Sequence, residues 1–397
     1  MIETLAVCRE RGVPLVVRGA GHSCGGQTLL EGGVVLWNRA DEPDASQHGD
    51  EVEVCGRSTW NGLEAFLGAR GRTAMILPDH LELTVGGTLS VGGYGVRSVA
   101  WGSQVDRVSS LRVITPDGQA RWLPADDPLA RRVLAGVGTL GVIERVRMPT
   151  LPARPAASWC SRSFDGLGPM ARWLRWVEAV EHPDLWLDAW WADDVAVAEW
   201  GLEAPDPERA KSRLVPGPPP ERERLAWHLP LLLHDKRWRW VTSFPDHRRL
   251  WIDLMMPHAP FVALCERLDR LRAEGGRPPT AAYLLVSRAP PGHVPAVASP
   301  SPWPVSYGLG LYFMVPPGES SASAERTIEL LRREGEALGA RPYRYGYGAE
   351  PPWDEEIERL RDELGAGEWF SPRRRRRSQI DDAGLVIQQG RAREDDR

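Results

Sequence analysis

The sequence predicts an α+β protein with two domains, and three observations support this prediction. The chain has 397 residues, which exceeds the usual length of one domain about twofold or more. Residues 1–150 are rich in glycine and in short apolar runs typical of strands. At residues 149–152 the composition changes, and the part that follows holds most of the 18 tryptophans. We therefore expect a first domain at residues 1–150, a second at 151–342 and a C-terminal segment at 343–397.

The elements of the first domain follow from hydrophobic spacing and from turn residues. Ile2 and Leu5 follow a helical period, and Gly12 suits the left-handed conformation that ends a helix. The turn at 116–118 predicts a hairpin, because proline favours the second position of such a turn. The expected strands lie at residues 13–17, 33–36, 51–54, 110–115, 119–123 and 142–148, and a helix carrying Leu63, Phe66 and Leu67 ends at Gly71.

The second domain is expected to have its own core, built from its tryptophan-rich segments. A helix is predicted at residues 260–272, where apolar side chains recur on one side. Two tracts rich in proline, 216–220 and 289–304, are typical of loops. From Tyr343 the chain is charged and helical and then poorly patterned, and we expect the basic run 373–377 to be a solvated tail.

Charge and composition disfavour several classes of protein. The net charge of −5 gives no indication of a nucleic-acid-binding surface. The longest apolar run, residues 229–233, is far too short to cross a membrane, and the first ten residues lack the apolar core of a signal peptide. The five cysteines include no CxxC pair and the nine histidines no HxxxH spacing, so neither a disulfide framework nor a metal site is expected. We expect a cytoplasmic enzyme that acts on a small molecule, with no nucleic-acid or membrane partner.

The glycine-rich segment 21–27, GHSCGGQ, fits two incompatible schemes. As G-x-S-x-G it would present Ser23 on the strand-to-helix turn of a hydrolase. Only about twenty residues precede it, however, and the chain returns to a strand at 33–36, which disfavours that scheme. In the second scheme, glycines let the backbone approach an anionic or planar ligand. This segment and residues 85–95, about 60 residues later, then indicate a cofactor with a pyrophosphate and a flat ring, although neither segment is the GxGxxG of a Rossmann site.

Four segments in order carry a family resemblance: RGAGHSCGGQ, PDHLELTVGGTLSVGGYG, WGSQVDRVSSLRVITPDGQ and LAGVGTLGVIERVRM. Together they resemble the PCMH-type FAD-binding domain of the vanillyl-alcohol-oxidase superfamily, and within it the cytokinin dehydrogenases. The resemblance covers residues 13–148 strongly and the rest weakly. It implies two small α/β subdomains, followed by a substrate domain with an antiparallel sheet flanked by helices. The family's first strand is expected to be missing before Met1, and its closing motif has only a faint echo at 381–390.

The resemblance implies FAD bound covalently, because His22 occupies the position of the histidine that bonds to the flavin 8α-methyl group. The alternative is a histidine that is hydrogen-bonded within a turn. Related oxidases with two covalent bonds to the flavin use a cysteine shortly before the second glycine-rich segment. No cysteine lies between Cys55 and Cys160 here, so the resemblance implies a single linkage. Cys24 is expected to be a buried small residue. The further positions that resemble the family's FAD contacts are Gly19, Ala20, Gly21, Ser23, Gln27, Thr84, Gly86, Gly87, Ser90, Tyr94 and Ile143.

The same resemblance implies roles for residues around the reacting centre. Asp79 lies where cytokinin dehydrogenases place their catalytic base beside the flavin, whereas a turn or helix cap is the alternative, and His80 is a second candidate base. Trp251 resembles the tryptophan that packs against substrate, but a core tryptophan is an equal interpretation. Tyr343 resembles the tyrosine with which the C-terminal segment returns to the flavin, with Tyr345 and Tyr347 as competing assignments.

These assignments predict a FAD-dependent oxidoreductase that moves hydride to flavin N5 from a C–H next to nitrogen or oxygen. By resemblance, the reaction is oxidative cleavage of a secondary amine side chain, with O₂ or a quinone as electron acceptor. One alternative is an oxidase of alcohols or natural-product intermediates, and another is a non-catalytic remnant of the fold. The substrate, the acceptor and the oligomeric state do not follow from the sequence.

Overall fold

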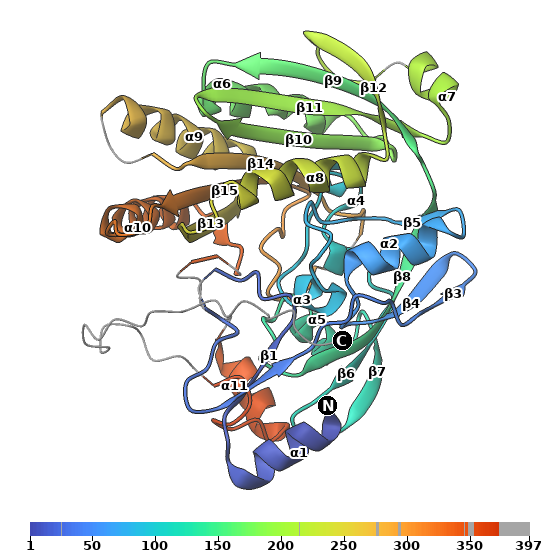
Figure 1. Cartoon of the computed structure of the whole chain (residues 1–397), viewed down its shortest axis with the longest axis vertical. Coiled ribbons are helices and arrows are strands. Elements are labelled where there is room, and N and C mark those ends of the chain that lie inside the picture. The colour runs from blue at the N-terminus through green and yellow to red at the C-terminus, as the bar shows by residue number, and fades with distance from the viewer. Residues whose placement is uncertain are drawn as a thin grey trace, which may run out of the picture.

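In the computed structural model, two small sheets form one part of the molecule and one large sheet forms the other (Figure 1). The first part has a two-stranded parallel sheet and a six-stranded sheet, and the second has an eight-stranded antiparallel sheet with helices packed on it. The predicted α+β class is therefore confirmed. The structure describes residues 1–24, 26–213, 215–274, 278–292, 295–344, 346–347 and 353–372.

The first part of the chain alternates short helices and strands. Its elements are α1 (Ile2–Arg11), β1 (Leu15–Arg18), β2 (Val34–Trp37), β3 (Ala45–His48), β4 (Glu51–Cys55), α2 (Trp60–Gly68), β5 (Arg72–Ala74), α3 (Val85–Leu89), α4 (Ser98–Trp101), a 3₁₀ turn (Gln104–Arg107), β6 (Ser110–Ile114), β7 (Ala120–Pro124), α5 (Pro128–Val133) and β8 (Val142–Pro152). The six-stranded sheet has the order β3-β4-β8-β6-β7, and β5 pairs with the far end of β8. Strands β1 and β2 pair in parallel.

Local sequence accounts for several of these boundaries. Gly12 ends α1 with φ 61°, and its amide donates to the carbonyls of Arg9 and Cys8. Strands β6 and β7 form the predicted hairpin, which the amide of Thr115 closes by donating to the carbonyl of Gln119. Both features were predicted because they depend on residues adjacent in sequence.

Two elements differ from the sequence expectation. The glycine-rich run at 85–89 forms a helical turn, α3, because the Thr84 side chain caps it by accepting from the amide of Gly87. Strand β8 extends past the expected end at Met148 to Pro152. Between the two prolines at its end, the amide of Thr150 donates to the carbonyl of Asp50 at 2.8 Å.

The second part is built on the sheet with the order β12-β9-β11-β10-β14-β15-β13-β16. Its elements are β9 (Ala156–Phe164), α6 (Leu167–Trp173), a 3₁₀ segment (Leu174–Ala179), β10 (Leu185–Ala192), β11 (Val195–Ala204), α7 (Pro207–Ser212), β12 (Arg222–Trp227), α8 (Leu229–Thr242), β13 (Arg248–Met256), α9 (His258–Ala273), β14 (Ala281–Arg288), β15 (Val305–Val315), α10 (Ala322–Ala337) and β16 (Arg341–Pro342), followed by α11 (Glu355–Glu363). The helix predicted at 260–272 is α9. Within the described ranges, none of the helices is long and apolar enough to cross a membrane.

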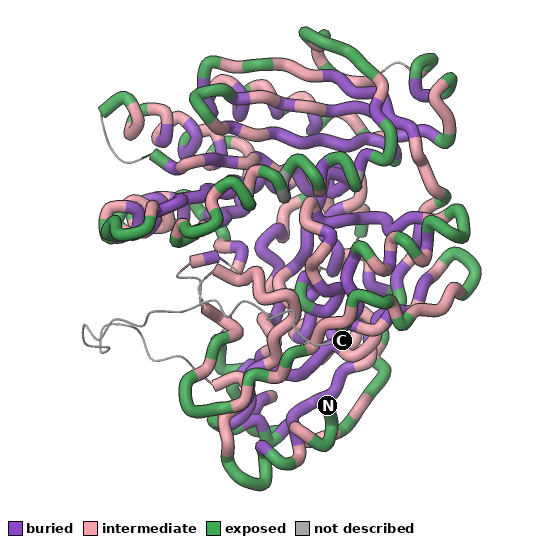
Figure 2. The backbone as a smooth tube through the Cα atoms, in the orientation of Figure 1, coloured by how far each residue is buried: buried purple, intermediate pink, exposed green. Residues whose placement is uncertain are grey.

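The two faces of the large sheet have different partners, because successive side chains of a strand point to opposite sides. In β13, Ile252 and Leu254 join the core formed with α6, α9 and α10. Met255 points the other way and packs with Tyr94 of the first domain. The strands are buried on both faces along much of their length (Figure 2). The large sheet therefore carries a helix-covered face and a face turned toward the first domain.

The chain returns to the first domain after β16. The amide of Leu15 donates to the carbonyl of Trp369 at 2.6 Å, and the amide of Ser371 donates to the carbonyl of Leu15 at 2.8 Å. Arg361 donates to the carbonyls of Thr139 and Phe370, each at 2.7 Å, and so holds this segment in place. The basic run 373–377, the faint motif at 381–390 and Tyr345 lie outside the described residues.

A buried ion pair joins the two domains. Arg97 follows the second glycine-rich segment, Glu203 lies on β11, and their side chains are 4% and 1% exposed. Two guanidinium nitrogens of Arg97 donate to both oxygens of Glu203 at 2.5 and 2.7 Å. A third donates to the carbonyl of Ala74 at 2.6 Å and to Thr73 Oγ1 at 3.2 Å. Burial disfavours both charges, and every guanidinium nitrogen of Arg97 has a hydrogen-bond partner.

We expect Arg97→Met to lower the free energy of unfolding by about 3–5 kcal/mol, because it leaves the Glu203 carboxylate buried without its cation. Urea unfolding followed by tryptophan fluorescence measures the change. The control is Arg121→Met, whose partner Asp117 forms a surface pair with it at 2.6 Å and whose side chain is 42% exposed. That control should cost less than about 1 kcal/mol, and equal losses in the two variants would contradict a special role for the buried pair.

Candidate functional site

One cavity lies between the two domains, and the site residues predicted from the sequence line it. It holds about 2080 Å³ of empty space, including its opening to solvent. The first domain contributes the end of β1, the loop after it, α3 and the start of β8, and the second contributes β10, β13, β14, β15 and α8. The site residues predicted from sequence that line it are Gly19, Ala20, Gly21, His22, Ser23, Gln27, Asp79, Thr84, Gly86, Gly87, Ser90, Tyr94, Ile143, Trp251 and Tyr343.

The loop after β1 brings bare backbone to the cavity wall. A Cβ on Gly19 would lie 2.3 Å from Thr84 Oγ1, so only glycine lets this loop approach α3 so closely. Gly21 has φ 74°, in the left-handed region that favours glycine. Within the described part of the chain, the amides of residues 20–23 have no hydrogen-bond acceptor. Consecutive free amides on a cavity wall are suited to bind an anionic group.

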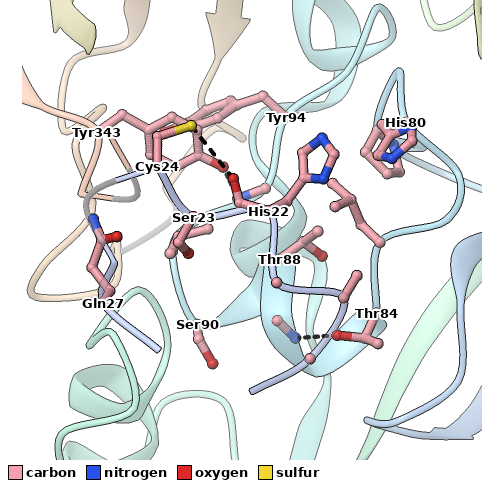
Figure 3. A pocket seen from close by; sticks show the side chains of 18 of the residues that line it. His22, Ser23, Cys24, Gln27, His80, Thr84, Thr88, Ser90, Tyr94 and Tyr343 are labelled. Atoms are coloured by element: carbon pink, nitrogen blue, oxygen red, sulfur yellow. Dashed lines mark hydrogen bonds between the residues drawn. The ribbon is translucent and has the colours of Figure 1, made fainter. Parts of the chain in front are cut away.

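Helix α3 forms a second wall of backbone. A Cβ on Gly86 would lie 3.0 Å from the carbonyl oxygen of Gly56, so the helix packs directly on the end of β4. Thr84 Oγ1 accepts from the amide of Gly87 at 3.3 Å (Figure 3). Ser90 Oγ donates to the carbonyl of Gly86 at 2.7 Å. These contacts fix the second glycine-rich segment as a helical turn on the end of β4.

Two histidine rings of the cavity wall, His22 and His80, stack on each other, and a third ring, His234, lies beside His80. The His22 and His80 rings lie 4.3 Å apart with an interplanar angle of 30° (Figure 3), and His80 and His234 are 5.4 Å apart. The amide of Leu81 donates to His234 Nδ1 at 3.3 Å. Among the described residues, no group of three or more potential ligands is placed to hold a metal ion. The contact with His80 limits the orientations open to the His22 ring.

The environment keeps two of these rings uncharged. Burial, followed by the nearby charge of Arg249, lowers the pKa of His22 from its usual 6.5 to about 4. Burial also lowers the pKa of His80 to about 3, with His22 and His234 adding to the effect. At neutral pH the His22 imidazole is thus unprotonated and has a nitrogen lone pair available.

Cys24 differs from the expectation of a buried small residue. Its side chain lines the cavity and is half-buried, with Sγ donating to the carbonyl of His22 at 3.5 Å. Burial raises the pKa of this thiol to about 12. It is therefore a protonated thiol on the cavity wall at neutral pH and not a reactive thiolate.

The returning segment after β16 closes one end of the cavity. Tyr343 packs edge-on against Tyr94 with ring centroids 5.2 Å apart, and the amide of Gly93 donates to its hydroxyl at 3.0 Å. Gln27 Nε2 donates to the carbonyl of Gly346 at 2.9 Å. Of the competing tyrosines, Tyr347 packs on the helix-covered core of the large sheet. Tyr343 is thus the described tyrosine that lines the cavity from this segment.

Asp79 lies half-buried on the cavity wall, directly after Pro78 and before the histidine stack. It does not cap the following helix, since Thr84 does so. A bend of the chain at this position remains compatible with a turn-forming role. The structure therefore places a carboxylate in the cavity on the same short segment as His80.

The second domain contributes an aromatic wall that the sequence analysis found only in part. The Trp251 ring lies 4.1 Å from Tyr312, and Trp190 and Trp240 lie 5.2 Å apart. Tyr283 is 5.9 Å from Trp251. These rings come from four strands and α8, and all line the cavity, as does Arg249. The alternation of β10, in which Trp190 is two residues from Asp188, was a signal for such a face, but the neighbouring strands could not be identified from sequence.

Comparisons with known proteins place the first domain in context. Residues 1–124 match the family described as FAD binding domain. An uncharacterized oxidoreductase, ORF5 in the fasciation locus of Rhodococcoides fascians, is 34% identical over 168 residues, 42% of this chain and 38% of its own length. Cytokinin dehydrogenases 1 and 7 of Oryza sativa subsp. japonica are 36% identical over 158 residues and 31% over 170, covering 37% and 40% of this chain and 30% and 32% of theirs. The matches thus cover well under two thirds of the relatives' lengths, and the predicted resemblance is confirmed over that part.

The neutral histidines predict a dependence of stability on pH. Below pH 6.5 an unfolded chain binds protons at His22 and His80 that the folded chain, with pKa values of about 4 and 3, does not bind. The free energy of unfolding should therefore fall as pH drops from 7 toward 4, by about 1–2 kcal/mol per histidine at pH 5. Urea unfolding at pH 7, 6 and 5 measures the slope.

The double variant His22→Gln, His80→Gln should flatten this slope. The matched control is His48→Gln, because His48 is exposed and lies outside the cavity. A slope that is unchanged in the double variant would show that other groups cause the acid sensitivity.

Proposed function

Because residues 1–124 match a FAD binding domain and part of the chain is similar to cytokinin dehydrogenases, we propose that it is a FAD-dependent oxidoreductase acting on a small organic substrate. The observation that carries the proposal is the single cavity, which joins every residue predicted to contact flavin with an aromatic wall from the second domain. The substrate class that the resemblance favours is an amine, whose side chain would be cleaved oxidatively at the C–H next to nitrogen.

The residues of the cavity fit FAD. The free amides of residues 20–23 offer donors for the pyrophosphate, and the glycine backbones of α3 leave room beside them. Gly138 also lines the cavity, and a Cβ added to it would meet no protein atom within 4 Å. The space beside it is therefore open. Tyr343, Tyr94 and His22 would surround the ring system. Bound FAD would supply a two-electron acceptor that takes hydride at flavin N5.

His22 would hold the cofactor covalently through a ring nitrogen. Bond formation at this nitrogen needs an uncharged imidazole, and burial provides one at neutral pH. The stacked ring of His80, 4.3 Å away, limits rotation of the His22 ring. The Cys24 thiol, with its raised pKa, is a poor competitor for the same bond.

Asp79 would accept the proton of the substrate N–H or O–H while hydride leaves the neighbouring carbon. Its position on the cavity wall, directly before His80 in the chain, is compatible with this role. Trp251 and the rings around it would hold a flat part of the substrate. The electrons would pass finally to O₂ or to a quinone.

The covalent linkage is tested by acid precipitation of the purified protein. We expect the yellow colour to remain in the pellet for the wild type and to be released or absent in His22→Ala. His48→Ala, on the exposed surface, is the control and should keep its colour in the pellet. Flavin released from the wild type would refute the linkage, and a colourless protein would refute the proposed function.

The role of Asp79 is tested by the rate at which substrate bleaches the flavin absorbance. With isopentenyladenine as the amine probe, Asp79→Asn should retain flavin and slow reduction by about 10² to 10⁴-fold, the usual contribution of a general base. Asp126→Asn is the control, since Asp126 is exposed and outside the cavity.

Unchanged reduction in Asp79→Asn would remove this residue from the reaction. Reduction by simple alcohols such as benzyl alcohol, but not by the amine, would instead favour the alcohol-oxidase alternative.

A further inference from the structure

Arg249 brings a cation to the substrate side of the cavity. It lies two residues before Trp251 on β13, so both side chains belong to the face of the large sheet that is turned toward the first domain. Both line the cavity, and Arg249 keeps its side chain exposed. Among the described lining residues, it is the one lysine or arginine.

The charge of Arg249 has no acidic partner in the part of the chain that the structure describes. Within the described ranges, no carboxylate lies within ion-pair distance of its guanidinium. Its neighbour Arg248, on the opposite face of the strand, pairs with Glu325 at 3.2 Å and donates to Ser321 Oγ at 2.6 Å. Arg248 is thus paired with a carboxylate on one face of β13, whereas Arg249 lies on the other face and lines the cavity.

The field of Arg249 reaches the reacting end of the cavity. Its positive charge contributes to the lowered pKa values of His22 and His80 and also acts on Cys24. The other charged group of the second domain on this wall, Asp188, pairs with Lys236 at 3.4 Å. Arg249 is therefore a local positive centre beside the histidine stack.

The surroundings of Arg249 suit a flat ligand. Trp251, Tyr312 and Tyr283 have ring centroids 4.1 to 6.0 Å apart, and Trp190 and Trp240 extend this wall. Aromatic faces bind planar apolar groups. A guanidinium next to them binds a carboxylate through two parallel hydrogen bonds.

We propose that the substrate is a planar, largely apolar molecule that carries a carboxylate, which pairs with Arg249 while its flat part lies against the rings around Trp251. This inference rests on the proposed function, since it assigns the substrate class of the same cavity. It identifies Arg249 as the residue that makes the cavity prefer an acidic amine to a neutral one such as isopentenyladenine.

The test uses two probes of the same shape that differ in charge, 2-naphthoate and 2-naphthamide. Isothermal titration calorimetry of the purified full chain at pH 7 measures the affinity for each. A charge-assisted pair predicts that naphthoate binds about 10- to 100-fold more tightly than naphthamide. Arg249→Met should reduce this ratio to about 1 without weakening naphthamide, and Arg249→Lys should restore part of it.

The matched control is Arg248→Met, which removes the same charge from the other face of β13 and should keep the full preference. Equal affinities in the wild type, no binding of naphthoate, or a preference that survives in a folded Arg249→Met would each overturn the proposal. Flavin content is read from the absorbance of the same samples. A colourless protein that still prefers naphthoate would refute the oxidoreductase assignment but support the role of Arg249.

Discussion

The buried ion pair between Arg97 and Glu203 helps to hold the second domain against the first beside the cavity. Arg97 lies immediately after Tyr94, Gly95 and Val96, which line the cavity, and its guanidinium bonds to both oxygens of Glu203. The amide of Leu187, at the start of β10, donates to the carbonyl of Val96 at 3.0 Å beside this pair. A charge buried to this extent tolerates little displacement, since each lost bond would leave a desolvated group. Loops from one domain and strands from the other are therefore held in register around a single space.

Much of the first domain could be predicted from the sequence because its features are local. The left-handed Gly12, the hairpin between β6 and β7 and the glycine-rich loop after β1 each depend on residues adjacent in the chain. The predicted flavin contacts come from such short segments, and the structure gathers them along one cavity. Their individual roles stay predictions, whereas their spatial grouping is a finding. The helical form of residues 85–89 was missed because it depends on a cap at Thr84 rather than on helix propensity.

The second domain could be predicted only in outline. Its aromatic wall needs the strand order β10-β14-β15-β13, which brings together segments more than 100 residues apart in the chain. Trp190 and Tyr312 meet at 5.8 Å only because β14 lies between their strands. An abundance of tryptophan fits a core and a binding wall equally well, so the sequence left both interpretations of Trp251 open. The sequence around Arg249 gave no indication of a site residue, because its position in the cavity follows from the face of β13 on which it lies.

The proposed chemistry and the proposed selectivity are coupled through the charge of Arg249. Burial is the larger cause of the low pKa of His22, and Arg249 is the smaller. A carboxylate bound to Arg249 would cancel part of the smaller contribution and raise the His22 pKa, but burial alone would still keep the ring neutral at pH 7. An anionic substrate can therefore bind close to the stacked histidines without protonating the ring proposed to hold the cofactor. Different residues of the cavity thus serve the cofactor and the substrate. The free amides of residues 20–23 would bind an anionic group of the cofactor, the neutral rings of His22 and His80 lie in the same cavity, and Arg249 would bind the substrate carboxylate.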